Sequence, residues 1–180
     1  MKAISLDLGC GKKKRPGYLG IDIAASANLD LRADLFRGIP LRDSVAERVY
    51  CDNFLEHVPN LIAMMNEIWR VCRHGAIVEM IVPYYTWMGA YQDPTHVRFF
   101  CEKTLIYFTR TLPYDYGFRG KFDVREVALA PNPEFQKEMS AIPFDIARKY
   151  FMNAVTNMSA TLVADKNFSG APRTPHEARS

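Results

Sequence analysis

The sequence lacks a strong charge of either sign and any long apolar run. Its 180 residues include 23 Lys and Arg against 20 Asp and Glu, so the formal net charge is only +3. This mild balance gives no indication of a nucleic-acid partner. No run reaches the roughly 18 apolar residues of a membrane span, and the first apolar run is short and contains an Asp, unlike a signal peptide. We therefore expect neither a membrane span nor a secretory signal.

Cysteine is also scarce, and its four residues lie far apart in the chain. Cys10, Cys51, Cys72 and Cys101 form no C-x-x-C pair. Such spacing is typical neither of disulfide-rich domains nor of cysteine zinc sites. We expect a cytoplasmic protein with no metal site.

Two apolar runs near the start of the chain end in residues that suit a cofactor. Leu6-Asp7-Leu8-Gly9-Cys10-Gly11 ends in Gly-x-Gly, and glycine allows close approach of the backbone to a ligand because it lacks a Cβ and reaches positive φ easily. Gly20-Ile21-Asp22-Ile23 then places a carboxylate where a ribose diol would lie. Together the two runs predict a site for an adenosine cofactor.

Strand-like and helix-like segments alternate along the chain. Leu61 to Cys72 carries apolar residues at helical spacing after Asn60, a suitable N-cap, and Gly75 is expected to stop this helix. Further helices are predicted at 102–109 and 144–155, and strands at 3–8, 18–23, 29–33, 48–51, 76–83, 124–130 and 160–164. The alternation predicts an α/β, Rossmann-like, mostly parallel sheet. We expect residues 1–168 to form a single domain and 169–180 a disordered tail.

Ligands of such sheets bind at the carboxyl ends of the strands, and several polar segments of this chain fall there. They include Gly9 to Gly11, Asp22, Asp34, Asp52 to Phe54 and the aromatic loop from Tyr84 to His96. The sequence therefore predicts one site at one edge of the sheet.

The loop after the first strand distinguishes between adenosine cofactors. A dinucleotide site needs a third glycine where Lys14 stands, and a helix N-terminus facing the pyrophosphate. The link from Gly9 to Gly17 contains Pro16 and is too short for a sizeable helix. A cofactor without phosphates, such as S-adenosylmethionine, suits this loop better.

At this point the chain resembles the class I S-adenosylmethionine-dependent methyltransferases, and among them a small type 11-like subgroup, over roughly its first 110 residues. The motifs that carry the resemblance are Leu6 to Gly11, Gly20 to Ile23, Ala33 to Leu35, Phe54 to Val58, Glu67 to Val71 and Asp93 to Phe100. The resemblance implies that Gly9, Cys10 and Gly11 line the methionine moiety, Asp22 the ribose, and Asp34 and Leu35 the adenine. The full predicted cofactor set is Asp7, Gly9, Cys10, Gly11, Asp22, Ile23, Asp34, Leu35, Asp52, Asn53 and Phe54.

The aromatic loop is the predicted acceptor side. His96, with Asp93 three residues earlier, is a candidate general base for in-line methyl transfer, and the alternative is that it only holds the loop. Arg98 is a candidate for binding an anionic acceptor, and Tyr84, Tyr85 and Tyr91 are candidates for the wall of the acceptor pocket. Glu56 and His57 are assigned to hydrogen bonds that organise the cofactor loop, with His57 as a second candidate base.

The links after the first two strands are too short for helices, so one face of the predicted sheet lacks cover. Because a bare apolar face is unfavourable in water, we expect the helix at 144–155, or a second copy in a homodimer, to cover it. The predicted function is methyl transfer from S-adenosylmethionine to a small-molecule or sugar-like acceptor. The alternative is a non-catalytic S-adenosylmethionine-binding subunit or regulator.

Overall fold

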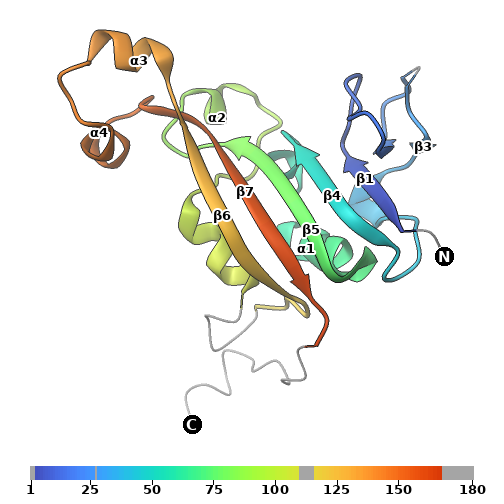
Figure 1. Cartoon of the computed structure of the whole chain (residues 1–180). Coiled ribbons are helices and arrows are strands. Elements are labelled where there is room, and N and C mark those ends of the chain that lie inside the picture. The colour runs from blue at the N-terminus through green and yellow to red at the C-terminus, as the bar shows by residue number, and fades with distance from the viewer. Residues whose placement is uncertain (1–2, 27, 110–115, 168–180) are drawn as a thin grey trace.

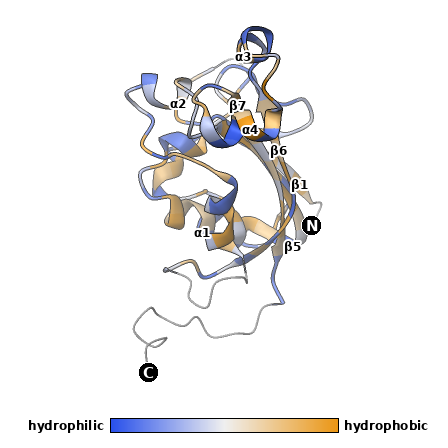
Figure 2. Ribbon diagram, turned by 90° about the vertical axis from the view of Figure 1, so that its left-hand side faces the viewer, coloured by the Kyte–Doolittle hydropathy of each residue, from blue (hydrophilic) through white to orange (hydrophobic). Residues whose placement is uncertain are grey.

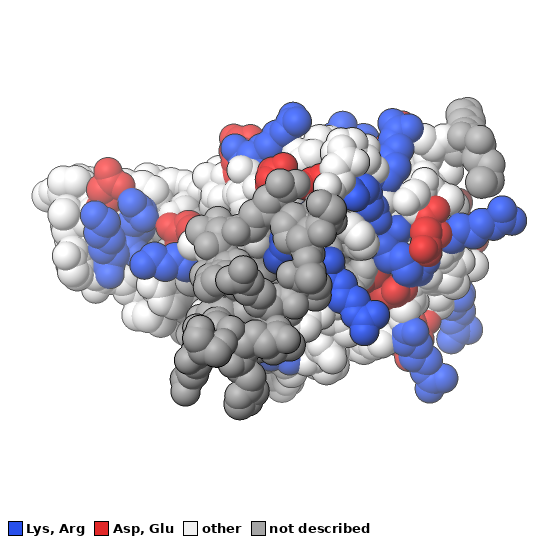
Figure 3. Space-filling view, turned by 90° about the horizontal axis from the view of Figure 1, so that it is seen from below, with Lys and Arg blue, Asp and Glu red and all other residues white. Residues whose placement is uncertain are grey.

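The computed structural model describes residues 3–26, 28–109 and 116–167 (Figure 1). The predicted tail at 169–180 lies outside these residues. In the part of the chain that is described, no helix is long and apolar enough to cross a membrane. Seen from below, basic and acidic side chains lie next to one another on the surface that is drawn in colour (Figure 3).

Seven strands form the sheet in the order β3-β2-β1-β4-β5-β7-β6. The first five strands of the chain run parallel, whereas β7 is antiparallel to both β5 and β6. The predicted α/β, mostly parallel sheet is therefore confirmed. The strands are β1 (Ile4–Leu8), β2 (Leu19–Asp22), β3 (Leu31–Arg32), β4 (Ala46–Asp52), β5 (Cys72–Pro83), β6 (Lys121–Pro131) and β7 (Val155–Asp165).

The helices between these strands are short. They are η1 (Leu35–Arg37), η2 (Leu55–His57), α1 (Leu61–Val71), α2 (Gly89–Gln92), η3 (Glu102–Phe108), α3 (Pro133–Glu138) and α4 (Phe144–Tyr150), where η marks a 3-10 helix. Asn60 caps α1 as predicted, because its side chain accepts a hydrogen bond from the N–H of Ala63 at 3.0 Å. The predicted stop at Gly75 is wrong: α1 ends at Val71, and Gly75, with φ of 76°, lies within β5.

The predicted helix at 144–155 is too long. α4 ends at Tyr150, Asn153 has a φ of 61°, and Val155 already begins β7. The apolar residues of this segment match a helix and a buried strand equally well. Pairing with β5 on one side and β6 on the other decides the strand.

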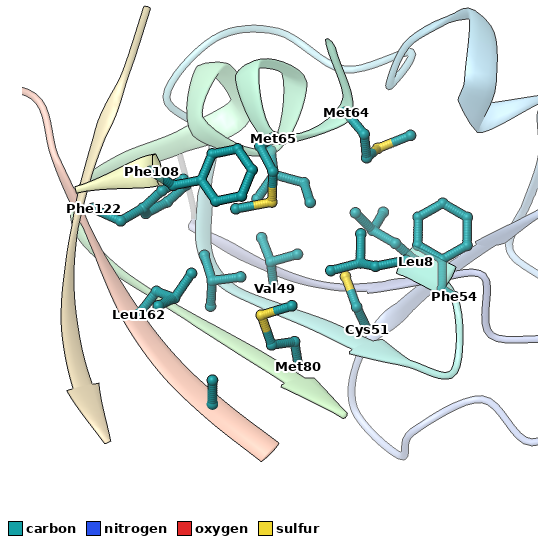
Figure 4. Close-up of a cluster of buried hydrophobic side chains, with 14 of the residues drawn as sticks. Leu8, Val49, Cys51, Phe54, Met64, Met65, Met80, Phe108, Phe122 and Leu162 are labelled. Carbon is teal, nitrogen blue, oxygen red and sulfur yellow. The ribbon is translucent and has the colours of Figure 1, made fainter. Parts of the chain in front are cut away.

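The core lies between the sheet and the helices α1 and η3. Leu8, Val49, Met80 and Leu162 project from neighbouring strands toward the methionines of α1 (Figure 4), and all four are buried. Each side chain of this size stabilises the fold by roughly 1.5–3 kcal/mol when it is removed from water. The burial of this face fixes the strands whose carboxyl ends form the site.

The opposite face of the sheet is open, and a polar row crosses its centre. No described helix lies over the central strands on this side (Figure 2). The strand register aligns Asp7 of β1 with Tyr50 of β4, Tyr50 with Glu79 of β5, and Glu79 with Thr161 of β7. Since side chains alternate along a strand, this row faces away from the core.

The loop after β1 covers part of the open face. The guanidinium of Arg15 lies 3.3 Å from the carboxylate of Glu79 and 4.4 Å from the ring centroid of Tyr50. Arg48 binds the same carboxylate at 2.9 Å. These ion pairs are partly exposed, so each contributes only roughly 0–1 kcal/mol. The main consequence of these ion pairs is that the centre of this face is polar and can be exposed to water.

The expectation that the segment at 144–155 covers the open face is wrong. α4 lies near the end of the β6–β7 pair (Figure 1), where its Arg148 binds Glu102 of η3 at 3.3 Å. The expectation assumed an apolar patch, but polar side chains occupy the central row instead.

Candidate functional site

A cavity of about 290 Å³ opens at the carboxyl ends of β1, β2 and β4. Seven of its ten lining residues, all but Ala33, Phe36 and His57, belong to the predicted cofactor set. The cavity is lined by Gly9, Asp22, Ile23, Ala33, Asp34, Leu35, Phe36, Asn53, Phe54 and His57. We call it the adenosine cavity below, after the part of the cofactor that the sequence predicts for these residues.

Gly9 is required at the base of this cavity. Its φ is 68°, and a Cβ built on it would lie 2.4 Å from a ring carbon of Phe54. Phe54 in turn stacks on Phe36, with ring centroids 6.3 Å apart. An alanine here would suffer both backbone strain and a steric clash. Glycine at this position therefore allows the ring of Phe54 to pack directly against the turn after β1.

Three predicted carboxylates fold the loops around the adenosine cavity. Asp22 accepts hydrogen bonds from the N–H of Gly11 at 2.8 Å and of Ala24 at 2.7 Å. Asp34 accepts from the N–H of Phe36 at 3.1 Å and caps η1. Each oxygen of a carboxylate has two lone pairs, so Asp22 retains acceptor capacity for a ligand hydroxyl.

Asp7 is the third of these carboxylates. It is buried, and it accepts from the N–H of Arg15 at 2.6 Å, which folds the β1 loop back over the sheet. Burial raises the pKa of this carboxyl above its usual range.

A second cavity of about 450 Å³ adjoins the first and shares Gly9 and Asn53 with it. It is lined by Asp7, Gly9, Cys10, Lys12, Lys13, Tyr50, Asp52 and Asn53. Asp52 is held there by the hydroxyl of Tyr50 at 3.2 Å and the amide of Asn53 at 2.8 Å. The sulfur of Cys10 packs near Gly20, and burial raises the pKa of its thiol to about 11.

All four cysteines of the chain are free thiols, and burial raises the pKa of Cys10, Cys51 and Cys72. A thiol with a raised pKa stays protonated at neutral pH and is a poor nucleophile. Cys10 is therefore no candidate nucleophile, although it lines the second cavity. Its contact with the methionine moiety stays a prediction.

On the predicted acceptor side, His96 is almost buried, with 9% of its side chain exposed. Its Nδ1 lies 3.1 Å from the carbonyl oxygen of Ala90, and a carbonyl only accepts, so Nδ1 carries the proton. Nε2 is then the basic nitrogen, 3.8 Å from a carboxylate oxygen of Asp93. The carbonyl of Ala90, more than the predicted Asp93, orients this ring.

His57 lies against His96, with ring centroids 4.7 Å apart. The hydroxyl oxygen of Thr95 lies 2.6 Å from Asp93 and 2.9 Å from Nδ1 of His57. Because a carboxylate only accepts, the single hydroxyl proton of Thr95 goes to Asp93, and His57 donates from Nδ1 to Thr95. The bonds from Thr95 hold the pKa of Asp93 below its usual range. Nε2 of His57 is therefore the nitrogen with a free lone pair in the neutral ring.

Glu56 completes this group. The sequence predicted that its hydrogen bonds organise the cofactor loop. The residue is 1% exposed, and neither carboxyl oxygen has a hydrogen-bond partner on another described residue. Burial raises the pKa of this carboxyl to about 7. Only the backbone of Glu56 organises a loop: its carbonyl accepts from the N–H groups of Val97 and Arg98 at 2.9 and 3.0 Å.

The other predicted acceptor residues lie outside both cavities. Tyr84 is buried in the core and its hydroxyl donates to Glu102 at 3.0 Å, whereas Tyr85 is partly exposed. Tyr91 is exposed and stacks on Phe99 with centroids 4.5 Å apart. The guanidinium of Arg98 donates to the carbonyl oxygens of Val58 and Pro59, which ties the loop to the start of α1.

No protein-family model and no curated protein matches the chain. Solved structures do match it. An S-adenosylmethionine-dependent methyltransferase from Archaeoglobus fulgidus aligns with a TM-score of 0.63 at 16% identity, over 90% of this chain and 86% of that one. The YcgJ protein of Bacillus subtilis aligns with a TM-score of 0.60 at 11% identity, over 93% of each chain.

The fold is that of class I S-adenosylmethionine-dependent methyltransferases. The cyclase SpnF also aligns with it, with a TM-score of 0.58 at 16% identity, over 91% of this chain and 75% of that one. Proteins of different activity therefore share this methyltransferase fold, and the fold alone does not determine the activity of this chain.

Proposed function

We propose that this protein transfers a methyl group from S-adenosylmethionine to a small-molecule or sugar-like acceptor. The observation that carries the proposal is the adenosine cavity, where Gly9, Asp22 and Phe54 meet at the strand ends of a methyltransferase fold. The border of this cavity at His57 leads directly to His96. The predicted cofactor residues thus lie next to His96, the predicted base.

The residues present fit the parts of S-adenosylmethionine. Asp22 offers acceptor capacity for the ribose hydroxyls, the cap at Asp34 and Leu35 borders the adenine, and the stacked Phe36 and Phe54 offer apolar surface. The cofactor supplies an activated methyl group on its sulfonium, so the protein contributes mainly orientation and exclusion of water. The second cavity, with Gly9 and Asp52, takes the methionine end.

We assign the activation of the acceptor to His96. An acceptor hydroxyl or amine must lose its proton during transfer, and Nε2 of His96 is a basic nitrogen with little access to solvent. Asp93 and Thr95 hold the neighbouring His57 in a fixed tautomer. Arg98 then acts by holding the loop that carries His96.

The test is transfer of a labelled methyl group from S-adenosylmethionine into a metabolite extract, together with calorimetric titration of S-adenosylhomocysteine. We expect binding and transfer by the wild type. The variant His96→Ala should bind the cofactor normally and lose roughly 10²–10⁴-fold in transfer rate, the usual contribution of general acid–base catalysis.

The control is His74→Ala, which changes a histidine at the opposite end of β5, where its Nδ1 accepts from the N–H of Lys166 at 3.2 Å. It should leave transfer unchanged. Cofactor binding without any transfer would point to the non-catalytic subunit, and no binding at all would remove the proposal.

We also infer that the protein works in the cytoplasm, from its scattered free cysteines.

A homodimer through the open face of the sheet stays a prediction. Sedimentation of the wild type and of Thr161→Arg, which places a charge in the central row, tests it: a monomer in both cases rules the homodimer out.

A further inference from the structure

Three potential metal ligands meet beside the adenosine cavity. Glu56 and His57 come from η2, and His96 comes from the loop that follows α2. One ligand atom of each, a carboxylate oxygen and two ring nitrogens, lies within 4.8 Å of the others. The backbone fixes this meeting, because the carbonyl of Glu56 holds the two residues that follow His96.

Both imidazoles are prepared as ligands. A histidine that binds a metal uses one nitrogen and usually donates from the other to a carbonyl, carboxylate or water, which sets the tautomer. Nδ1 of His96 donates to the carbonyl of Ala90, and Nδ1 of His57 donates to Thr95 and through it to Asp93. The Nε2 lone pairs of the neutral rings remain for a shared ligand.

The carboxyl group of Glu56 points to the same conclusion independently. A buried polar group without a partner is costly, and most such groups in folded proteins are paired. Glu56 is 1% exposed, and both of its oxygens lack a hydrogen-bond partner among the described residues. A cation between the carboxylate and the two rings supplies the missing partner.

We propose that Glu56, His57 and His96 bind one divalent transition-metal ion. Two imidazoles and one carboxylate suit ions of intermediate softness, such as Zn²⁺, Co²⁺ or Fe²⁺, better than Mg²⁺ or Ca²⁺, which prefer oxygen ligands. Zinc lies about 2.0–2.2 Å from such ligands, so the three atoms move somewhat closer together when the ion binds. Three protein ligands would leave a fourth position of a tetrahedral ion for water or another ligand.

Metal binding also changes the role of His96 in methyl transfer, and this step rests on the proposed function. Proton removal and metal binding both use Nε2 of His96, so His96 cannot act as the base while it holds the ion. In the metal-bound protein His96 would be a ligand, and the ion, as a Lewis acid, would make an acceptor hydroxyl acidic enough to lose its proton to solvent water. Glu56 and His57, which a simple base would not require, then become necessary.

The experiment measures metal binding directly. The protein is stripped with a chelator and titrated with Zn²⁺ by calorimetry and with Co²⁺ by visible absorption. We expect one ion per chain and a cobalt spectrum of nitrogen and oxygen ligands, without the thiolate charge-transfer band that cysteine ligation would add. Saturating Zn²⁺ should also raise the thermal unfolding temperature of the wild type.

Matched variants separate the site from the rest of the chain. Glu56→Gln, which keeps the shape of the side chain, and His57→Ala should each weaken binding by at least roughly 100-fold. Thr95→Val removes only the bridge from His57 to Asp93, and should weaken it roughly 10–100-fold, as loss of an outer partner does. His74→Ala should have no effect. Circular dichroism checks that each variant is folded.

Wild-type affinity no higher than that of Glu56→Gln and His57→Ala would overturn the inference, and so would a thiolate band in the cobalt spectrum. Cofactor binding and methyl transfer are measured separately on the same samples. Transfer by a stripped protein that takes up no ion would refute the metal site and leave the proposed function intact. Specific metal binding without cofactor binding would do the reverse.

Discussion

The two sides of the site are built on different principles. On the proposed cofactor side, at the ends of β1 to β4, the carboxylates of Asp7, Asp22 and Asp34 each accept a hydrogen bond from a backbone N–H. On the acceptor side, formed by η2 and residues 93–98, the buried carboxyl of Glu56 has no partner among the described residues. The cofactor side is electrostatically complete without a ligand, and the acceptor side is not.

This difference shows which side chains shape the site and which are available for chemistry. A carboxylate that holds a loop cannot move far without unfolding that loop, so the proposed cofactor side is preorganised before any ligand binds. An unpartnered buried carboxyl is unfavourable for stability, and such costs are typical of functional sites. Variants on either side can test the comparison.

The largest effect is expected for Gly9→Ala on the cofactor side. The new Cβ would lie 2.4 Å from a ring carbon of Phe54 at a φ of 68°, so the wall of the adenosine cavity must shift. Calorimetry should show at least roughly 100-fold weaker S-adenosylhomocysteine binding, equivalent to about 2.7 kcal/mol. Gly17→Ala has a similar φ of 80° but meets no atom within 4 Å, and should leave binding unchanged. Equal losses in both variants would mean that strain, and not the cavity wall, is responsible.

A gain in stability, instead of a loss of binding, is expected for Glu56→Met on the acceptor side. Methionine fills a similar volume and removes a buried carboxyl without a partner, so the free energy of unfolding should rise by about 1–3 kcal/mol. Urea denaturation in the presence of a chelator measures this. The control is Glu67→Met, because Glu67 is bonded to Arg70 at 2.7 Å and to the N–H of Ile39 at 2.9 Å and should lose stability. A loss in both variants would remove the distinction between the two sides.

A smaller effect is expected for Asp22→Asn. An asparagine oxygen can replace one of the two bonds to Gly11 and Ala24, but its amide group cannot accept the other. Cofactor affinity should fall roughly 10-fold, equivalent to about 1.4 kcal/mol. Asp30→Asn is the matched control: Asp30 accepts from the N–H of Gly20 at 2.8 Å but does not line the adenosine cavity. The cofactor affinity of the Asp30→Asn variant should equal that of the wild type.

Local patterns predicted most of the residues that line the adenosine cavity. The run that ends in Gly9 and the run that ends in Asp22 each carry their own geometry, because strand, turn and acid lie within a few residues. The sequence did not predict Phe36 as a lining residue, because only its stacking on Phe54 brings it to the cavity. The end of α4 escaped for a similar reason: the segment from Val155 forms a strand because two neighbours pair with it.

The sequence by itself determined the parallel sheet, the glycine turn and the acids at the strand ends, because apolar runs, helical periodicity and backbone freedom act over short stretches of chain. The tertiary structure alone decided two things. It placed Arg15 and Arg48 on Glu79, which makes the centre of the open face polar. It also brought His96 to Glu56 through the backbone carbonyl of Glu56, and such a long-range hydrogen bond leaves no periodic signal in the sequence.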